Sequence, residues 1–510
     1  MRRWASVAAV AAMVLAGGAG RAQPAEPVPT VRMKIDSGVL IGVSHPNAEV
    51  FRNIPYAAPP VGPLRWRPPQ PVTPWAAPRQ AIFPGPSCPQ PMRADNAPND
   101  GGANGPTSED CLQLNVFAPK HASHAPVMVW IHGGGHRTGA GWIYDGQNFA
   151  RDGVVLVAIN YRLGALGYFA HPGLVKAARP GEPVGDYGLM DQIAALKWVQ
   201  RNIAAFGGDP KNVTVFGESA GGMSTLALLA TPAARGLYQK AIVESGLGWF
   251  RPITLAEKEK EGVEKLAAIG VPATATAADL RAIPVDKLVP IDADYEPFVD
   301  GKLMTETASQ ALARGHFDDV PLIIGSNSGE DSLLGPGPLR TGVLATFAPA
   351  MAKPVYAAEE AAGGDQLMAR ALFTDQVMGG PARWVAAGAS TGQPAWLYHF
   401  SYIGNRFRPA KTRASHADEI QYVFEYWGRR TPMSVVSEED KQMATLMHAC
   451  WVAFARTGAP SCGGMAWPAY TPASDQLMEF GPKSGAVAHF RKVQLDALQA
   501  VELPRLELGK

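Results

Sequence analysis

A serine flanked by glycines stands where a predicted strand meets a predicted helix. Gly217–Gly221 has the sequence GESAG, follows the apolar run Val213–Phe216 and precedes a helix-like run from Gly222 to Ala230. Glycines on both sides of a serine permit a tight turn from which the hydroxyl projects at the edge of a sheet. An ordinary glycine turn is the alternative, because the chain holds 54 glycines in 510 residues. The flanking runs favour Ser219 as a nucleophile.

A glycine triplet follows an earlier predicted strand. His132-Gly133-Gly134-Gly135 comes directly after the apolar run Val127–Ile131. Backbone N–H groups of consecutive glycines are unobstructed and can point at an oxygen that becomes negative in a tetrahedral intermediate. The N–H of Ala220, next to the serine, would add a donor. A phosphate-binding loop is the competing interpretation, but no Lys-Ser or Lys-Thr pair follows the glycines. The sequence therefore predicts an oxyanion hole.

Acidic and imidazole side chains follow two later predicted strands. Glu330 and Asp331 come in the loop after Leu322–Ile324, and His416 lies on the loop after Trp396–Phe400. In hydrolases with this kind of serine turn, the acid follows the serine along the chain and the histidine follows the acid. Chain order does not choose between Glu330 and Asp331, and either could be a solvated loop carboxylate. His416 is the histidine that we expect to act as the base.

Predicted strands and helices alternate along the chain. An apolar stripe with helical spacing runs from 189 to 206 and is followed by Gly207-Gly208-Asp209-Pro210. This alternation is typical of a mostly parallel sheet covered by helices on both faces, with chemistry at the carboxyl ends of its strands. We expect the α/β class, an α/β-hydrolase fold, and one large catalytic domain over residues 23–510. The predicted strands are Val127–Ile131, Val154–Ile159, Val213–Phe216, Ala241–Glu244, Leu322–Ile324 and Trp396–Phe400.

The composition fits one large globular unit. Hydrophobic residues make up 46% of the chain and charged residues 18%, which is enough for a large core and too little charge for disorder. Lys and Arg total 46 against 45 Asp and Glu, so the net charge of +1 gives no general attraction to nucleic acid or anionic membranes. We expect no nucleic-acid partner, and any charge selectivity must be local.

The first residues have the features of an export signal. Two arginines precede an apolar stretch from Ala5 to Ala16, and small residues continue to Ala22. A membrane anchor is the alternative, but the apolar run is short for a bilayer and ends at glycines and an arginine. We predict a signal peptide over residues 1–22 and no stable membrane anchor. The protein would then be periplasmic or secreted, and the pattern points to a bacterial source.

Four cysteines are present, Cys88, Cys111, Cys450 and Cys462. In an oxidising compartment, an even number at modest separations favours two local disulfides, Cys88–Cys111 and Cys450–Cys462. Free buried thiols are the alternative, more so for the second pair. The spacing fits no zinc site, so we expect no metal.

Three further segments carry a family resemblance. They are Asn53–Gly62 (NIPYAAPPVG), Glu109–Val116 (EDCLQLNV) and Asn202–Pro210 (NIAAFGGDP), the last leading into the serine turn. With the motifs above, the chain resembles the type-B carboxylesterase and cholinesterase family of α/β-hydrolases, and most closely its bacterial, para-nitrobenzyl-esterase-like branch. The resemblance implies Glu330 as the acid, and it supports His416 and the Cys88–Cys111 loop. It also implies that Glu218 and Ser245 belong to a buried polar network around the triad.

The chemistry implied by the resemblance is hydrolysis of a small-molecule carboxylic ester through an acyl-serine intermediate. His416 would take the proton of Ser219, Glu330 would orient the imidazole, and the N–H groups of Gly134, Gly135 and Ala220 would hold the oxyanion. No metal or cofactor is needed. Two alternatives remain: a binding module that has lost catalysis, and amide hydrolysis by the same triad.

Two departures from the family bear on the substrate. Between Cys88 and Cys111 the chain has no Trp, Tyr or Phe, so the aromatic partner of a choline ester is missing there. His136-Arg137 stands where relatives usually carry an aromatic residue. If either side chain contacts the substrate, a polar or acid-bearing ester is favoured; otherwise these bases are surface residues or pair with internal acids. Basic residues before His416 that would add positive potential are Arg406, Arg408, Lys411 and Arg413.

Overall fold

The computed structural model describes residues 29–335, 337, 353–428 and 431–508. The predicted signal peptide, residues 1–22, lies outside the described residues. No helix in the described ranges is both long and apolar enough to cross a membrane.

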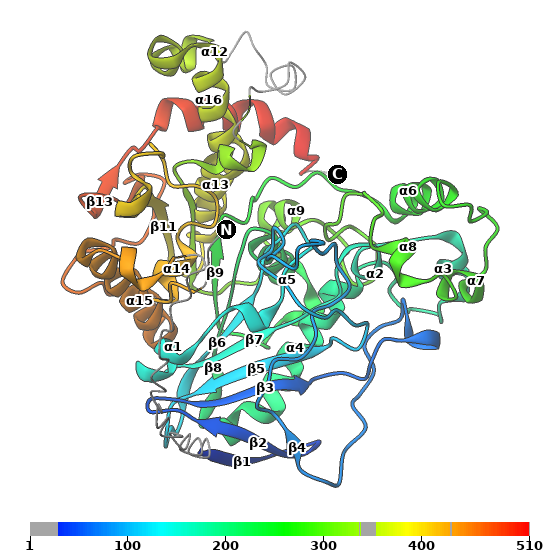
Figure 1. Ribbon diagram of the computed structural model, residues 1–510. Coiled ribbons are helices and arrows are strands. Elements are labelled where there is room, and N and C mark those ends of the chain that lie inside the picture. Colours follow the sequence, from blue (N-terminus) through cyan, green and yellow to red (C-terminus); the bar gives the residue numbers. More distant parts are fainter. Residues whose placement is uncertain (1–28, 336, 338–352, 429–430, 509–510) are drawn as a thin grey trace, which may run out of the picture.

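A large mixed sheet forms the centre of the molecule (Figure 1). Its strand order is β1-β2-β3-β5-β7-β6-β8-β9-β10-β11-β12-β13, with β4 paired to β2. Neighbouring strands run parallel from β7 through β12, and antiparallel pairs lie at both ends. The strands are β1 (Thr30–Ile35), β2 (Gly38–Ser44), β3 (Glu49–Pro55), β4 (Arg79–Gln80), β5 (Gln113–Ala118), β6 (Ala125–Ile131), β7 (Val155–Ile159), β8 (Gly208–Glu218), β9 (Lys240–Glu244), β10 (Leu322–Asn327), β11 (Ala395–Phe400), β12 (Gln476–Phe480) and β13 (Gly485–Ala488).

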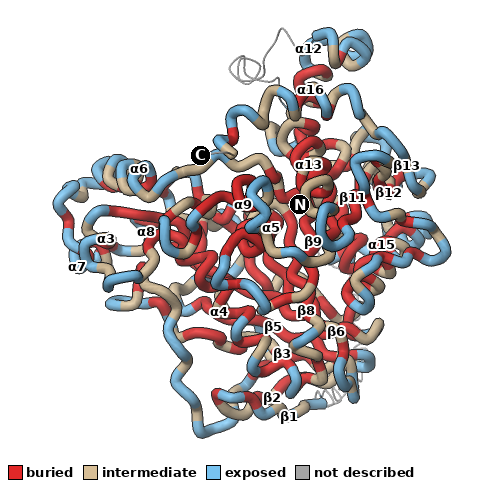
Figure 2. The backbone as a smooth tube through the Cα atoms, turned by 180° about the vertical axis from the view of Figure 1, so that it is seen from behind, coloured by how far each residue is buried: buried red, intermediate tan, exposed pale blue. Residues whose placement is uncertain are grey.

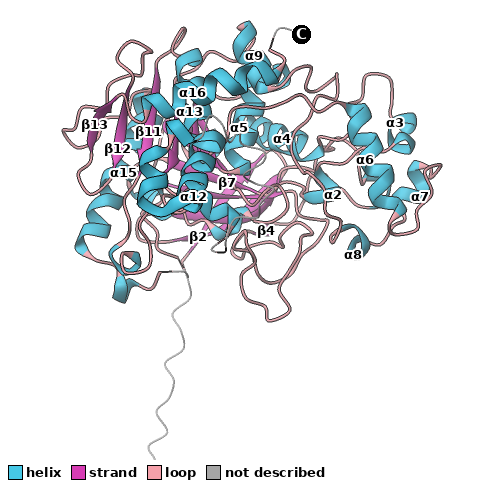
Figure 3. Ribbon diagram, turned by 90° about the horizontal axis from the view of Figure 1, so that it is seen from above, coloured by secondary structure: helices cyan, strands magenta, loops and turns pink. Residues whose placement is uncertain are grey.

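Helices cover the sheet on both faces (Figure 3). Figure 1 shows α3, α6, α7 and α8 gathered at one side and α12, α13 and α16 stacked near the top. The helices are α1 (Gln147–Arg151), α2 (Gly164–Gly167), α3 (Pro172–Ala177), α4 (Tyr187–Asn202), α5 (Ala220–Ala230), α6 (Leu255–Ala267), α7 (Ala277–Arg281), α8 (Val285–Leu288), α9 (Ala308–Arg314), α12 (Ala357–Thr374), α13 (Gly380–Ala389), α14 (Ile420–Val423), α15 (Glu438–Thr457) and α16 (Lys492–Glu502).

Two apolar cores lie on opposite faces of the sheet, and the sequence of β6 shows why. Val129 and Ile131 belong to the core beneath α4, α5 and α13, whereas Met128 and Trp130 belong to the core beneath α1 and α15. Successive side chains of a strand point to opposite faces, so a strand that is buried on both must be apolar throughout. Figure 2 shows the resulting pattern, with a buried centre at β5, β6 and β8 and exposed outer helices α6, α7 and α12.

The predicted strands are all present, and the sheet confirms the α/β-hydrolase fold. Val127–Ile131 lies within β6, and Leu322–Ile324 begins β10, which extends to Asn327. The predicted helix from 189 to 206 is α4 followed by a 3-10 turn, and it ends at Gly207, whose φ of 78° is left-handed. The edge strands were not predicted from the sequence.

Candidate active site

Ser219 occupies the sharp turn between β8 and α5. Its φ of 56° and ψ of −123° lie outside the usual regions for a residue with a side chain, and its N–H donates to the Glu244 carbonyl at 2.9 Å. Gly221 makes the turn possible, because a Cβ there would lie 2.0 Å from the Ile131 carbonyl oxygen on β6. Ser219 therefore lies in a strained turn, and Gly221 is the residue that lets α5 approach β6 this closely.

Glu330 and His416 are hydrogen-bonded to each other. His416 Nδ1 lies 2.6 Å from Glu330 Oε2, and the Glu330 side chain is fully buried. The other Glu330 oxygen, Oε1, accepts from the Ser245 hydroxyl at 2.6 Å and from the Asn327 N–H at 2.7 Å. Because both oxygens have partners, the carboxylate is held in one orientation against the imidazole.

Asp331, the other acid that chain order allowed, is engaged elsewhere. Its Oδ2 pairs with Arg370 Nη1 at 3.0 Å and with Arg413 Nη2 at 2.9 Å. These two arginines neutralise the carboxylate, and no contact between Asp331 and His416 is found in the described part of the chain. The structure therefore places Glu330, and not Asp331, on the histidine.

A group of buried glutamates surrounds the imidazole. Glu218 Oε1 lies 3.1 Å from His416 Nε2. Burial disfavours the charged imidazole, but the carboxylates of Glu218 and Glu330 outweigh it and raise the pKa of His416 to about 10. Burial raises the pKa of Glu244 to about 8, although a hydrogen bond from Trp451 acts to lower it. Burial also raises the pKa of Glu419. The site therefore favours an imidazolium.

The glycine loop lies directly against Ser219. A Cβ on Gly133 would be 3.0 Å from the Ser219 Cβ, and Gly134 and Gly135 have φ of 105° and 62°. A Cβ on Gly134 would lie 2.3 Å from the Thr138 carbonyl oxygen. Only glycine tolerates this combination of left-handed backbone and close approach, so the loop can present its N–H groups beside the serine.

His136 does not reach the pocket. It is fully buried, with Nδ1 2.9 Å from the Tyr295 carbonyl oxygen and Nε2 2.9 Å from the Ser224 hydroxyl. Nδ1 must carry the proton, because a carbonyl oxygen only accepts, and Nε2 then accepts from Ser224. Burial lowers the pKa of His136 to about 4. This side chain connects the glycine loop to α5 and is not among the residues that line the pocket.

Arg137 lines the pocket but is paired. Its guanidinium bonds to Asp292, whose side chain is 85% exposed. The basic residues before His416 also have partners: Arg408 pairs with Glu439, Lys411 with Asp418, Arg413 with Asp331, and Arg406 stacks on Phe407. Pairing with acidic residues, one of the alternatives left open by the sequence, describes Arg408, Lys411 and Arg413, whereas the guanidinium of Arg406 lies over an aromatic ring.

Ser219, His416 and the glycine loop open into one pocket of about 1350 Å³. That volume accommodates a drug-sized molecule. One wall comes from the Cys88–Cys111 loop through Pro91–Arg93 and Pro98–Gly102, and much of the rest is aromatic. Its aromatic residues are Trp142, Tyr144, Tyr295, Phe407, Phe424, Tyr426 and Trp427.

Sequence reasoning missed this aromatic wall and also Arg52, which lines the same pocket. The aromatic residues come from segments far apart in the chain and share no motif. The sequence holds one indication that Arg52 is unusual: a charged residue stands directly after the apolar Val50 and Phe51 in β3.

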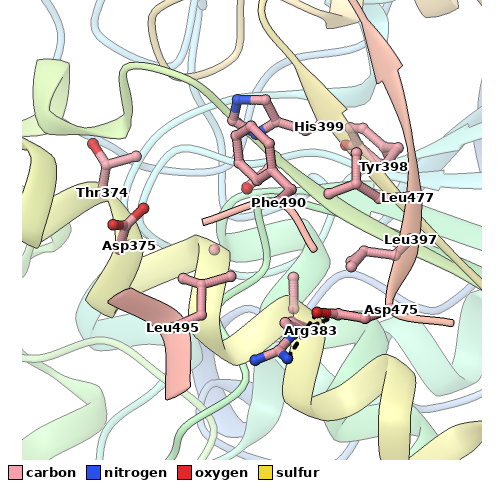
Figure 4. Close-up of a pocket in the computed structure, with 13 residues that line it drawn as sticks. Thr374, Asp375, Arg383, Leu397, Tyr398, His399, Asp475, Leu477, Phe490 and Leu495 are labelled. Atoms are coloured by element: carbon pink, nitrogen blue, oxygen red, sulfur yellow. Dashed lines mark hydrogen bonds and ion pairs between the residues drawn. The ribbon is translucent and has the colours of Figure 1, made fainter. Parts of the chain in front are cut away.

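The cavity drawn in Figure 4 is a different one. It has about 20 Å³, lies between β11, α13 and α16, and is bordered by the ion pair of Arg383 with Asp475 at 2.7 Å. Such a volume is close to that of one water, so this cavity is too small for an ester.

Both expected disulfides are formed. Cys88 is bonded to Cys111 and Cys450 to Cys462. One group with the spacing of metal ligands occurs in the described ranges, at Asp152, Glu425 and His448. Arg151 already bridges its two carboxylates, at 2.6 Å from Asp152 and 2.5 Å from Glu425, and the three residues do not line the pocket that holds Ser219.

Comparison with known proteins identifies the family. The model of the carboxylesterase family matches residues 28–340 and 350–498. The chain belongs to the carboxylesterase family. The Fumonisin B1 esterase of Sphingopyxis macrogoltabida is 37% identical over 479 residues, covering 88% of this chain and 86% of that protein. The para-nitrobenzyl esterase of Bacillus subtilis strain 168 is 37% identical over 467 residues, covering 85% and 91%.

Solved structures of carboxylesterases agree with this assignment. A PNB esterase superposes with a TM-score of 0.80 at 32% identity, covering 92% of this chain and 99% of that one. A thermophilic PNB esterase gives a TM-score of 0.81 at 33% identity, with the same coverage. As a carboxylesterase, the chain is a serine hydrolase that acts on carboxylic ester bonds of small molecules.

Proposed function

We propose that this carboxylesterase uses Ser219 as nucleophile, His416 as base and Glu330 as the acid that orients the base. The contact between His416 Nδ1 and Glu330 Oε2 at 2.6 Å carries the proposal, because Ser219 and His416 also line one pocket. A carboxylate on Nδ1 fixes the tautomer that protonates Nδ1 and leaves Nε2 to accept a proton.

The reaction proceeds in two steps. Deprotonated His416 takes the proton of Ser219 through Nε2 while the serine oxygen attacks the ester carbonyl, and the imidazolium then protonates the leaving alcohol. Water, activated by His416, hydrolyses the acyl-serine and restores the enzyme. Glu218 and Glu330 stabilise the imidazolium that forms in each step, and Ser245 keeps Glu330 in position.

The oxyanion would be held by the N–H groups of Gly134, Gly135 and Ala220. The loop geometry beside Ser219 supports this assignment. Each such donor acts on charge that develops only in the transition state, and losing one typically raises the barrier by about 3 kcal/mol.

The natural substrate is proposed to be a polar or acid-bearing ester. Arg137 supports this, because its partner Asp292 is 85% exposed and a substrate carboxylate could replace it at little cost. Esters of Fumonisin B1 and para-nitrobenzyl esters, for which two relatives are named, are the first compounds to test.

We also propose that residues 1–22 direct export and that residues 23–510 form one catalytic domain in the periplasm or outside the cell. The two disulfides support an oxidising location. Mass spectrometry of the protein from culture fractions tests the cleavage near Ala22; a chain that retains Met1 in those fractions would contradict it.

The decisive test of the catalytic serine is covalent labelling. Incubation with an organophosphonate ester should add one phosphonyl group to the intact protein, measured by mass, and Ser219→Ala should lose both the adduct and the hydrolysis of nitrophenyl esters. Ser461→Ala, at an exposed serine, is the matched control and should retain both. An adduct on folded Ser219→Ala protein, or wild-type-like turnover by it, would refute the assignment.

A further inference from the structure

Arg52 is a charged side chain in the wall of the substrate pocket. It lies in the middle of β3, and its side chain is only 18% exposed. The pocket that it lines also contains Ser219 and His416. A guanidinium is charged at every accessible pH, so β3 carries a permanent positive charge to the pocket.

The ion pair of this charge is long and is not a hydrogen bond. The nearest carboxylate oxygen, Asp145 Oδ2, is 3.9 Å from Arg52 Nη2, beyond hydrogen-bond distance. The Asp145 carboxylate instead accepts from the Gln147 N–H at 2.9 Å and from the Gln147 Nε2 at 3.0 Å, which hold it towards α1. The Phe117 ring, 5.2 Å away, covers one side of the guanidinium. Over the ranges that the structure describes, we find no hydrogen bond from the Arg52 side chain.

Three other buried arginines have hydrogen-bonded carboxylate partners. Arg65, Arg162 and Arg383 are 9%, 3% and 10% exposed. Each donates two hydrogen bonds of 2.6 to 3.0 Å to the two oxygens of one carboxylate. Burying a charge without such a hydrogen-bonded partner is costly, so Arg52 differs from these three arginines.

We propose that Arg52 binds a carboxylate group of the substrate. The inference rests on the proposed esterase site and names a chemical class for its substrate: an ester that carries a free carboxylate some distance from the bond that is cleaved. Two parallel N–H donors of a guanidinium match the two oxygens of a carboxylate. In the pocket, aromatic side chains of Trp142, Tyr144 and Tyr426 would border the connecting part of the substrate.

Arg137 provides a contrast within the same pocket. It already has Asp292, and that pair is exposed to solvent, where exchange of one carboxylate for another gains little. Arg52 is more buried and its only ion pair in the described ranges, with Asp145, is not hydrogen-bonded, so a substrate carboxylate would gain more there. We therefore expect Arg52 to contribute more than Arg137 to discrimination.

The test uses pairs of esters that differ only in the charged group. Para-nitrophenyl hemiglutarate against para-nitrophenyl pentanoate places the carboxylate on the acyl side. 4-Carboxybenzyl acetate against benzyl acetate places it on the alcohol side. For one of the two pairs, Arg52→Gln should lower kcat/KM for the charged ester by about tenfold or more, because a charge-assisted bidentate hydrogen bond is lost. The kcat/KM for the neutral ester of that pair should change by less than about twofold.

Three further variants complete the experiment. Arg52→Lys keeps the charge without the planar fork and should give an intermediate loss. Arg137→Gln should change the ratio less than Arg52→Gln. Arg201→Gln, at an exposed arginine outside the pocket, should change neither substrate.

The outcomes separate this inference from the esterase assignment. If the wild type hydrolyses neither member of either pair, the proposed function fails. If neutral esters are hydrolysed and Arg52→Gln lowers both members of each pair equally, or changes neither, Arg52 has a structural role and the inference is overturned. If Arg52→Gln does not fold, Arg52→Lys decides by the same ratio, with neutral-ester turnover as the measure of intact protein.

Discussion

Two carboxylates decide at which pH His416 can act as a base. Glu330 contacts Nδ1 and Glu218 lies 3.1 Å from Nε2, and together they raise the pKa of His416 to about 10 in spite of burial. A base must be deprotonated, so we expect kcat/KM to increase with pH through the alkaline range. The same charges stabilise the imidazolium formed during attack, which offsets the small fraction of neutral imidazole at lower pH.

Removing the charge of Glu218 should change this pH dependence. Glu218→Gln takes away a carboxylate that raises the pKa of His416, so that pKa falls and the rising limb of the profile moves to lower pH. The measurement is kcat/KM of a neutral nitrophenyl ester from pH 5 to 10. Glu218→Asp keeps the charge and should leave the limb closer to that of the wild type. A limb that stays in place in Glu218→Gln would show that Glu218 does not control the base.

At the scale of single residues, the sequence pointed to candidate reactive groups more directly than to the side chains that hold them. Ser219 was identifiable because the turn demands glycines at fixed positions around it. Chain order did not decide between Glu330 and Asp331, because both stand on the same loop, and only the family resemblance implied Glu330. The choice depends on Arg370 and Arg413, which come from distant segments to engage Asp331.

At the scale of elements, the turn between β8 and α5 depends on how closely the helix approaches β6. A Cβ at Gly221 would lie 2.0 Å from the Ile131 carbonyl oxygen, so Gly221→Ala must push α5 away from the sheet. Overpacking of this kind typically costs about 1–3 kcal/mol, and the shift would also displace Ser219. We expect a lower melting temperature together with slower phosphonate labelling.

Gly485→Ala is the matched control for this substitution. A Cβ at Gly485, the first residue of β13, meets no atom within 4 Å. We expect stability and labelling rate to stay close to those of the wild type. Equal losses in Gly221→Ala and Gly485→Ala would show that a general loss of glycine, and not the contact with β6, is responsible.

Central strands were predictable and edge strands were not, for a physical reason. β6 and Leu322–Ile324, the first half of β10, are buried on both faces and read as unbroken apolar runs. β1 and β13 alternate between intermediate and exposed positions, and their register depends on pairing partners, so their sequences carry a weaker signal.

At the scale of the whole molecule, the pocket forms where segments far apart in the sequence pack together. Its walls come from β3, the Cys88–Cys111 loop, the glycine loop, the segment 293–295, the region 416–428 and Thr431. No local pattern in the sequence predicts which side chains of these segments meet. The proposed catalytic groups follow from motifs, whereas substrate preference depends on packing between distant parts of the chain.

The two disulfides offer a test of whether substrate binding depends on the packing of the pocket wall. They close loops with sequence separations of 23 and 12 residues, for which loop entropy predicts a similar stabilisation of about 3 kcal/mol each. Only the loop between Cys88 and Cys111 forms part of the pocket wall.

Replacing both members of either pair with serine should lower the melting temperature to a similar extent, because the two loops have similar entropy. Loss of Cys88–Cys111 should in addition raise KM for a nitrophenyl ester, because the wall is no longer held in place, whereas loss of Cys450–Cys462 should leave KM unchanged. A similar rise of KM in both double variants would mean that the pocket responds to overall stability and not to its own wall.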